Sequence, residues 1–316
     1  MEIKDLITEI TDEGRPLTSS HLADLSRITA ADMPALKAVW RGIEVKRRRQ
    51  IIARLIELAR DSVELTFDLI YGYALRDTDA EIRVGAIDGL WDNEDPTLIK
   101  TFIDLMERDV SYDVQAAAAS ALGRFAMLAE CEEIRAEYRE QLGTALLSAI
   151  DSRDKPVEVR RRALESVAPL SLPAVREAIK KAYDSRDERL VTSAVYAMGR
   201  TCNKAWLPVI YKELDNPNAE IRYEAASACG EIGVIDSVSH LLERVNDADT
   251  EVRLAVIQAL GKIGGAEAKK DLQKIALDPG DAIREAVEQA LAEIETMEDV
   301  TLFEVDVPGD RDDKRN

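Results

Sequence analysis

Histidine and cysteine are scarce in this chain of 316 residues, which has two of the first and three of the second. His21 and His240 lie far apart in sequence, so chemistry that needs a cluster of histidines is nearly excluded by their number alone. Cys131, Cys202 and Cys229 are widely spaced and form no Cys-x-x-Cys pair, which argues against a disulfide framework or a zinc ribbon. We therefore expect three reduced thiols, no metal and no cofactor.

Long apolar runs are absent as well. No segment approaches the ~18 uninterrupted apolar residues of a membrane helix. The first 14 residues alternate charged with apolar residues, where a secretory leader has a basic start followed by an apolar run. Together with the reduced thiols, these absences predict a cytoplasmic protein with no membrane partner.

Positive charge is in deficit, because 42 basic residues face 61 acidic ones, a net charge of −19. Nucleic acids and anionic membranes are bound through basic surfaces, so this balance disfavours a general binder of either. Apolar residues make up 46% of the chain, which is enough for a substantial core.

Segments of similar sequence recur along the chain. Each has an acidic residue, then Ile or Val, usually then Arg, and then small and apolar residues at helical spacing, as in Glu220-Ile-Arg-Tyr-Glu-Ala-Ala-Ser-Ala-Cys-Gly230. The residue after the acidic position falls at 82, 114, 159, 190, 221, 252 and 283. The intervals are 32, 45, 31, 31, 31 and 31 residues, and four equal intervals in succession indicate an internal repeat.

Each repeat is predicted to be a helical hairpin. A second amphipathic stretch lies between successive copies, and nothing indicates a strand of any length. Acidic runs before the repeated segment, such as Asp247-Ala-Asp-Thr-Glu251, supply capping residues for the helix that follows. We interpret the glycines that follow the last apolar residue as helix C-caps; they are Gly123, Gly199, Gly230 and Gly261.

The pattern D-x-[DN]-x-E-[IV]-R-x-x-A-x-x-A-L-G resembles the HEAT-repeat family, especially the short HEAT-like repeats of the phycobilisome-lyase type. The resemblance covers roughly residues 76–295. It implies an all-α fold, a right-handed α-solenoid of stacked helical hairpins with a period of about 31 residues, whose second helices line a concave face. The motif is specific for the fold and says little about function, because its residues are structural.

Three regions follow from this repeat. Residues 1–75 form an N-terminal helical capping region, residues 76–298 form the repeat array, and residues 299–316 form an acidic tail that we expect to be disordered. Within the tail, the alternating stretch 300–307 could pack in extended form on the last repeat. The long interval holds an insertion near 127–142 that lengthens a helix or adds one, either as a neutral extension or as a partner-specific protrusion.

Arginine recurs at one position of the repeat. It could form a phosphate-binding ladder, but local acidic residues match each copy, so we expect pairing with Asp residues of neighbouring turns. The copies are Arg83, Arg160, Arg222, Arg253 and Arg284.

The chain has one basic region. Residues 37–60 carry eight basic and two acidic residues, including a basic patch of Arg41, Lys46, Arg47, Arg48 and Arg49. Three interpretations stay open: a solvated helix flank, a docking site for an acidic partner such as nucleic-acid phosphate, or contact with the acidic tail or with another copy of the chain.

The positions three, seven and eleven residues after the acidic residue should escape the core and face the concave side. They vary between repeats and carry our candidate partner-binding residues, because exposed Tyr with Arg is typical of interface hot spots. These are Thr192, Tyr196, Arg200, Tyr223 and Lys262. The bland alternative is that the tyrosines are packing residues, as we also expect of Trp40, Trp91 and Trp206.

The function predicted is a non-catalytic scaffold or adaptor, monomeric, that binds a protein partner through its concave face. We name no catalytic residue. Alternatives are a bilin lyase-like enzyme subunit or a nucleic-acid-processing HEAT-like protein. A di-iron hydroxylase of this architecture needs several His-Glu pairs, and this chain has none.

Overall fold

The computed structural model describes the backbone of residues 3–12, 14–275 and 280–305, and over these residues the chain is helical with no β-strand. The predicted all-α fold of stacked helical hairpins is therefore confirmed. The helices divide into two compact units, residues 1–175 and 176–316.

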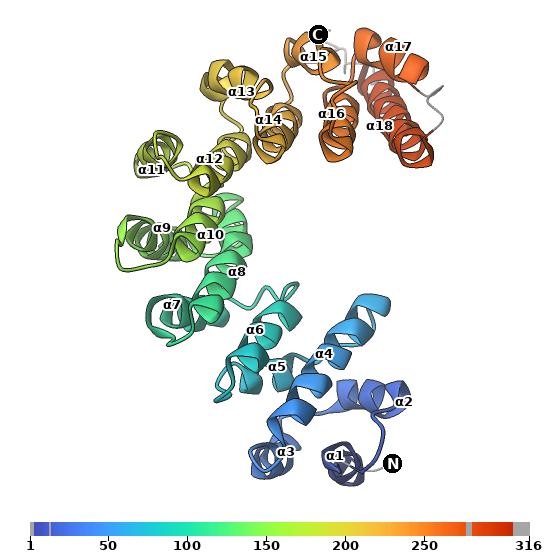
Figure 1. The fold of residues 1–316 in the computed structure, drawn as a ribbon. Coiled ribbons are helices and arrows are strands. Elements are labelled where there is room, and N and C mark those ends of the chain that lie inside the picture. Colours follow the sequence, from blue (N-terminus) through green and yellow to red (C-terminus); the bar gives the residue numbers. More distant parts are fainter. Residues whose placement is uncertain (1–2, 13, 276–279, 306–316) are drawn as a thin grey trace, which may run out of the picture. The chain divides into compact units, whose positions relative to one another are not determined.

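The first unit holds two rows of helices. Its elements are α1 (Ile3–Thr11), α2 (Ser19–Ala23), the 3-10 helix η1 (Asp24–Arg27), α3 (Met33–Trp40), α4 (Val45–Asp61), α5 (Asp68–Ala74), α6 (Ala80–Gly89), α7 (Thr97–Arg108), α8 (Tyr112–Glu130), α9 (Ala136–Asp151) and α10 (Val157–Val167). Helices α4, α6, α8 and α10 pack on one another in succession, and α5, α7 and α9 pack against them from the other side (Figure 1).

The second unit repeats this arrangement, and the boundary between the units falls within α11. Its elements are α11 (Pro173–Tyr183), α12 (Glu188–Arg200), the 3-10 helix η2 (Lys204–Trp206), α13 (Leu207–Glu213), α14 (Ala219–Ile232), α15 (Ser237–Leu242), α16 (Thr250–Ile263), α17 (Ala266–Ile275) and α18 (Asp281–Val305). Helices α12, α14, α16 and α18 pack in succession, and most of them carry the repeated motif. We call this row, and α4, α6, α8 and α10 of the first unit, the motif row.

The acidic runs before the motif-row helices act as N-caps, as predicted. The Asp79 side chain accepts a hydrogen bond from the backbone N–H of Ile82, and Asp249 accepts from Glu251 and Val252. Each such cap is worth about 1 kcal/mol, because it satisfies a donor that the helix cannot pair internally.

The repeated glycines are not C-caps, and that prediction is wrong. They lie inside the motif-row helices, where a Cβ would come within 3.0 Å of an atom of the next helix in the row: Gly123 against Ser166, Gly199 against Ala228, Gly230 against Ala259 and Gly261 against Ala290. The missing side chain lets two helices cross closely. The residue that caps α14 is Gly233, which has the positive φ of +67° that favours glycine.

Two of the repeated arginines pair with an Asp in the turn of the next repeat, as predicted. Arg83 on α6 makes a two-pronged ion pair with Asp109, and Arg222 on α14 makes the same pair with Asp247. Both arginines also donate to a backbone carbonyl of their own turn. Arg160 donates instead to the Ile150 carbonyl. A two-pronged pair fixes orientation as well as distance, so it sets the angle between turns.

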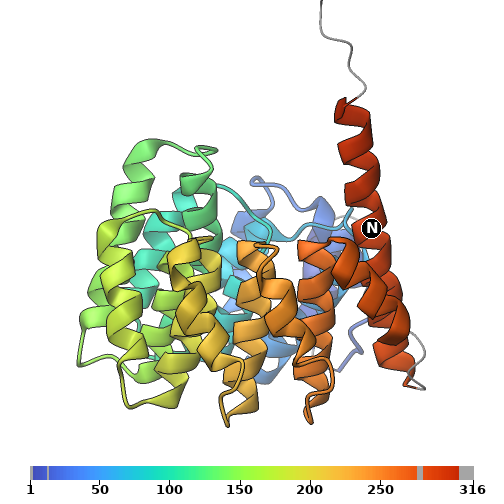
Figure 2. The same ribbon diagram turned by 90° about the horizontal axis from the view of Figure 1, so that it is seen from above.

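The insertion lengthens two helices. α8 has 19 residues and α9 has 16, whereas the other motif-row helix of this region, α10, has 11. The acidic tail is only partly described. α18 runs 25 residues to Val305, well past the ends of its neighbours (Figure 2), so the extended conformation expected from residue 300 is wrong as far as residue 305. Residues 306–316 lie outside the described part.

Candidate functional site

The predicted partner-binding residues lie on α12, α14 and α16 of the second unit. Tyr196 on α12 and Tyr223 on α14 are 37% and 36% exposed, on two helices that pack against each other. Both tyrosines therefore keep about a third of their surface available outside the core.

Ion pairs join the three helices at the position eleven residues after the acidic position of the repeat. Arg200 of α12 lies 2.9 Å from a carboxylate oxygen of Glu231 on α14, and Lys262 of α16 lies 2.6 Å from the other. Burial raises the pKa of Glu231, but hydrogen bonds and charges from Lys262 and Arg200 outweigh it and hold that pKa below its usual value. The three residues are 31 positions apart in sequence, so neighbouring repeats are in register on this face.

Thr192 does not share this exposure, and the expectation that it faces outward is wrong. It is 3% exposed, and its hydroxyl donates to the Glu188 carbonyl one turn earlier in the same helix at 3.0 Å. A short β-branched side chain that bonds its own backbone stays close to the helix surface, where neighbouring side chains cover it.

The basic patch is mostly not a surface. Arg47 and Arg48 are 7% and 5% exposed. Arg47 donates to the backbone carbonyls of residues 10 and 12, while Arg48 pairs with Asp77, which also accepts from the indole of Trp40 at 2.7 Å. These basic residues, which are consecutive in sequence, make hydrogen bonds and ion pairs inside the unit. Arg48 does so because α4 faces the acidic turn before α6.

The other three residues of the patch differ in their surroundings. Arg49 makes a two-pronged pair with Asp79 at 2.9 and 2.7 Å, while Arg41 and Lys46 are exposed. All three arginines at residues 47–49 make contacts within the first unit: Arg47 with the end of α1, and Arg48 and Arg49 with the α5–α6 turn. Docking of an acidic partner stays a prediction for the exposed members of the patch, Arg41 and Lys46.

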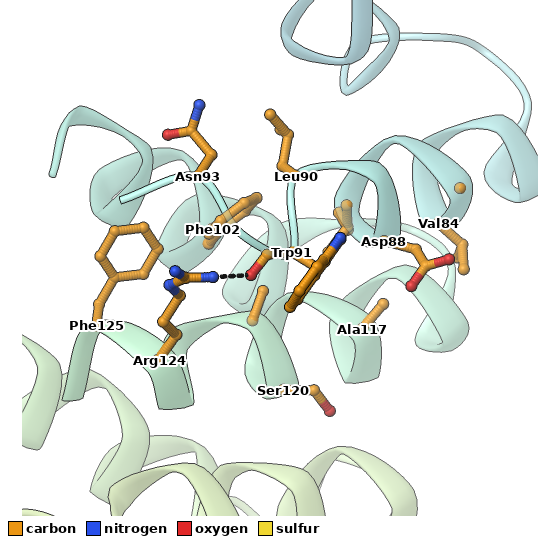
Figure 3. Close-up of a pocket in the computed structure, with 13 residues that line it drawn as sticks. Val84, Asp88, Leu90, Trp91, Asn93, Phe102, Ala117, Ser120, Arg124 and Phe125 are labelled. Carbon is orange, nitrogen blue, oxygen red and sulfur yellow. Dashed lines mark hydrogen bonds between the residues drawn. The ribbon is translucent and has the colours of Figure 1, made fainter. Parts of the chain in front are cut away.

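A feature that the sequence did not reveal is a cavity of about 460 Å³ beside Trp91 in the first unit. Trp40 and Trp206 are buried as expected, but Trp91 is 62% exposed, which corrects that expectation. It lies just after α6 ends, and Figure 3 shows its indole over α8 beside Ala117. The only available signal was a Trp directly after the last apolar residue of a repeat.

The chain's two histidines belong to different units. His21 is on α2, and His240 is on α15, where its ring stacks on Tyr211 with centroids 3.9 Å apart. Over the described residues, no group of three or more His, Cys, Asp or Glu side chains has the arrangement that holds a metal ion. No described helix is both long and apolar enough to cross a membrane.

Comparison with known proteins gives one family match. The family model for HEAT repeats matches residues 207–292. Deoxyhypusine hydroxylases of Drosophila pseudoobscura pseudoobscura and Drosophila melanogaster are each 30% identical over 105 residues. The match covers 33% of this chain, and it spans 35% of the length of these relatives.

Solved structures of similar form have low sequence identity. Human deoxyhypusine hydroxylase in complex with glycerol is 18% identical, covering 93% of this chain and 97% of that one, with a TM-score of 0.37. A designed armadillo repeat protein is also 18% identical, covering 62% and 99%, with a TM-score of 0.40. The family match over residues 207–292 and the stacked helical hairpins of the described residues together show that this chain contains HEAT repeats.

Proposed function

We propose that this chain is a non-catalytic scaffold that binds a protein partner through the face of the second unit formed by α12, α14 and α16. The observation that carries the proposal is the register of that face. The ion pairs from Arg200 through Glu231 to Lys262 align three repeats, and Tyr196 and Tyr223 are partly exposed on two of the same helices. The HEAT-repeat resemblance supports the proposal that this face is the concave side.

The chemistry of the face fits a protein better than a small molecule. Tyrosine offers a rigid ring with a polar end, and it is enriched at interface hot spots. Arg200 and Lys262 are already paired with Glu231, so they hold the tyrosines' surroundings fixed more than they offer free charge. We place the protein in the cytoplasm as a monomer, in keeping with its three free cysteines.

The test is affinity capture from a native lysate with the wild-type chain, with Tyr196→Ala/Tyr223→Ala, and with Tyr112→Ala. Tyr112 is 57% exposed in the first unit and serves as a matched control. We expect a partner protein that the wild type and the control retain and the double variant loses, with little change in melting temperature. Capture that survives both substitutions unaltered would contradict the surface, and recovery of nucleic acid alone would contradict the scaffold.

An enzymatic role is the second candidate, because the curated relatives are named as hydroxylases. The residues present weigh against transferring that activity. The chain has two histidines, on α2 and α15, and its matched stretch is about a third of the relatives' length. The bilin lyase-like alternative has no further observation in its favour, and the nucleic-acid alternative is weakened because Arg47 and Arg48 of the basic patch are buried.

A further inference from the structure

The cavity beside Trp91 exists because α6 is short and the facing part of α8 carries small side chains. α6 ends at Gly89 after 10 residues, while α8 continues for 19. The wall on α8 includes Ala117, Ser120 and Ala121, and Gly85 contributes to the wall on α6. Two packed helices with small facing residues leave a groove that no side chain of this unit fills.

The groove is apolar at its base and has an aromatic rim. Phe102 and Phe125 are each 1% exposed and form the floor, while Trp91 stands at the edge with 62% of its surface exposed (Figure 3). A volume of about 460 Å³ falls within the ~300–1,000 Å³ of ordinary ligand pockets. An exposed Trp above a preformed apolar pocket is the composition of a binding hot spot.

Trp91 is exposed but held in place. Arg124 of α8 donates to the Trp91 carbonyl and, at 2.6 Å, to Glu94, so the segment after α6 is tied to α8 at two points. Asn93 donates to Asp68 at 2.7 Å and ties the same segment to α5. Binding of a partner would therefore cost little conformational entropy, because the segment that carries Trp91 is already held in place.

The rim is acidic. Asp88 lines the groove, and Asp92, Glu94 and Asp95 follow it in the next seven positions, against Arg60 and Arg124 as the nearby bases. Burial raises the pKa of Asp68; the hydrogen bond from Asn93 lowers it, and the negative charge of Asp92 adds to the rise. A ligand of opposite charge is favoured at such a rim.

From this geometry we propose that the Trp91 groove is a docking site for an amphipathic helix of a partner protein, with apolar residues facing the groove and Lys or Arg on its flank. Helices present apolar residues at three- and four-residue spacing, which suits a groove between α6 and α8. The site is separate from the tyrosine face of the second unit, so each proposal can fail alone.

The experiment uses the full chain and three synthetic peptides with a helical pattern. One has leucines on one face and lysines on the other, the second has glutamate for lysine, and the third has serine for leucine. Trp40 and Trp206 are buried, so Trp91 dominates the fluorescence that acrylamide can quench. We expect saturable binding of the leucine–lysine peptide, a blue shift and protection from quenching, with at least tenfold weaker binding of the other two.

Two variants test the groove itself. Ala117→Phe fills it, and Trp91→Ala removes the rim; each should weaken the leucine–lysine peptide by about tenfold or more when measured by anisotropy of a labelled peptide. Tyr112→Ala, with similar exposure, should bind like the wild type. Circular dichroism melts check folding, and Trp91→Ala changes an exposed side chain, so the test survives a misfolded Ala117→Phe variant.

Four outcomes would overturn the proposal. They are absence of saturable binding, unchanged binding by both groove variants, equal binding of the lysine and glutamate peptides, and equal binding of the serine peptide, which would mean attraction by net charge alone. Light scattering adds a fifth. If the wild type is a dimer that Ala117→Phe dissociates, the groove is occupied by a second copy of the chain and not by a different protein.

Discussion

At the scale of single residues, the repeated glycines determine how closely the motif-row helices approach. A Cβ on Gly230 would lie 2.9 Å from Cα of Ala259, an atom that cannot rotate away. A methyl group there must push two helices apart or distort one of them. The sequence pattern identified these glycines correctly as important but gave them the wrong role, because a glycine at a helix end and one at a helix crossing look alike in one dimension.

This contact predicts the effect of Gly230→Ala. We expect it to lower the free energy of unfolding by about 1–3 kcal/mol, the usual cost of overpacking, although alanine is the better helix former. Gly72→Ala is the control, because nothing lies within 4 Å of its Cβ position. That variant should be neutral or more stable by about 0.5–1 kcal/mol, as measured by urea denaturation. Equal effects of the two substitutions would contradict the proposed crossing.

The arginine–aspartate pairs have a measurable pH dependence. The hydrogen bonds from Arg222 hold the pKa of Asp247 below its ordinary value of 3.8. A carboxyl with a depressed folded pKa contributes stability that is present above the unfolded pKa and lost as the pH falls through the folded one. The contribution should therefore be constant near neutral pH and should fade below about pH 4.

Asp247→Asn tests this. Near neutral pH it should destabilise the chain by about 3 kcal/mol, since it leaves Arg222 without its charge partner. The difference from wild type should shrink as the pH falls below about 4, because protonation then breaks the pair in the wild type too. Urea titrations at several pH values measure both curves. A difference that persists undiminished in acid would show that the pair is not what the substitution removes.

At the scale of helices, the sequence predicted most of the architecture. The pattern Glu–Ile/Val–Arg marked α6, α10, α14 and α16 because capping, core and pairing residues recur at fixed spacing. It did not mark α4, which reads Glu44-Val-Lys, yet Arg48 lies four residues after the N-cap, as Arg83 does, and pairs with the acidic turn in the same way. The capping region thus contains a repeat helix that the motif does not reveal.

The candidate sites were less predictable than the helices. Exposure of Trp91 depends on where α6 ends and on the hydrogen bonds that hold the following segment to α8. The periodicity of apolar residues predicts neither. The burial of Arg47 and Arg48 depends on which turn faces α4, which is a contact between residues about 30 positions apart. Long-range partners of this kind are outside what one sequence specifies.

The last helix supports a prediction at the same scale. α18 covers α16 with a buried stripe that includes Val287, Ala290 and Ile294. Removing the chain from Gly265 onward should expose the matching face of α16, which lowers the urea midpoint and promotes aggregation because a terminal repeat shields its neighbour. Sedimentation and a urea titration against the full chain measure both effects. A soluble truncated chain with an unchanged midpoint would show that α16 needs no cover.

At the scale of the whole molecule, net charge and charge distribution must be separated. The basic stretch over 37–60 suggested an electrostatic binding surface in a chain of net charge −19. Inside the first unit, Arg48 and Arg49 pair with aspartates, and Arg47 donates hydrogen bonds to backbone carbonyls. The rest of the stretch therefore presents fewer basic groups for an outside partner than its sequence indicates.

One contact has a further consequence. Gly123 of α8 meets Ser166 of α10 although the lengthened α8 and α9 add residues between them, in the same manner as the glycines that have no added residues before their partners. The spacing of α8 and α10 is thus fixed where they cross, and the mostly exposed tip at residues 131–135, between α8 and α9, lies outside that crossing. A foreign epitope or a second domain grafted at that tip should leave the row undisturbed, which makes it the natural attachment point for engineering this chain.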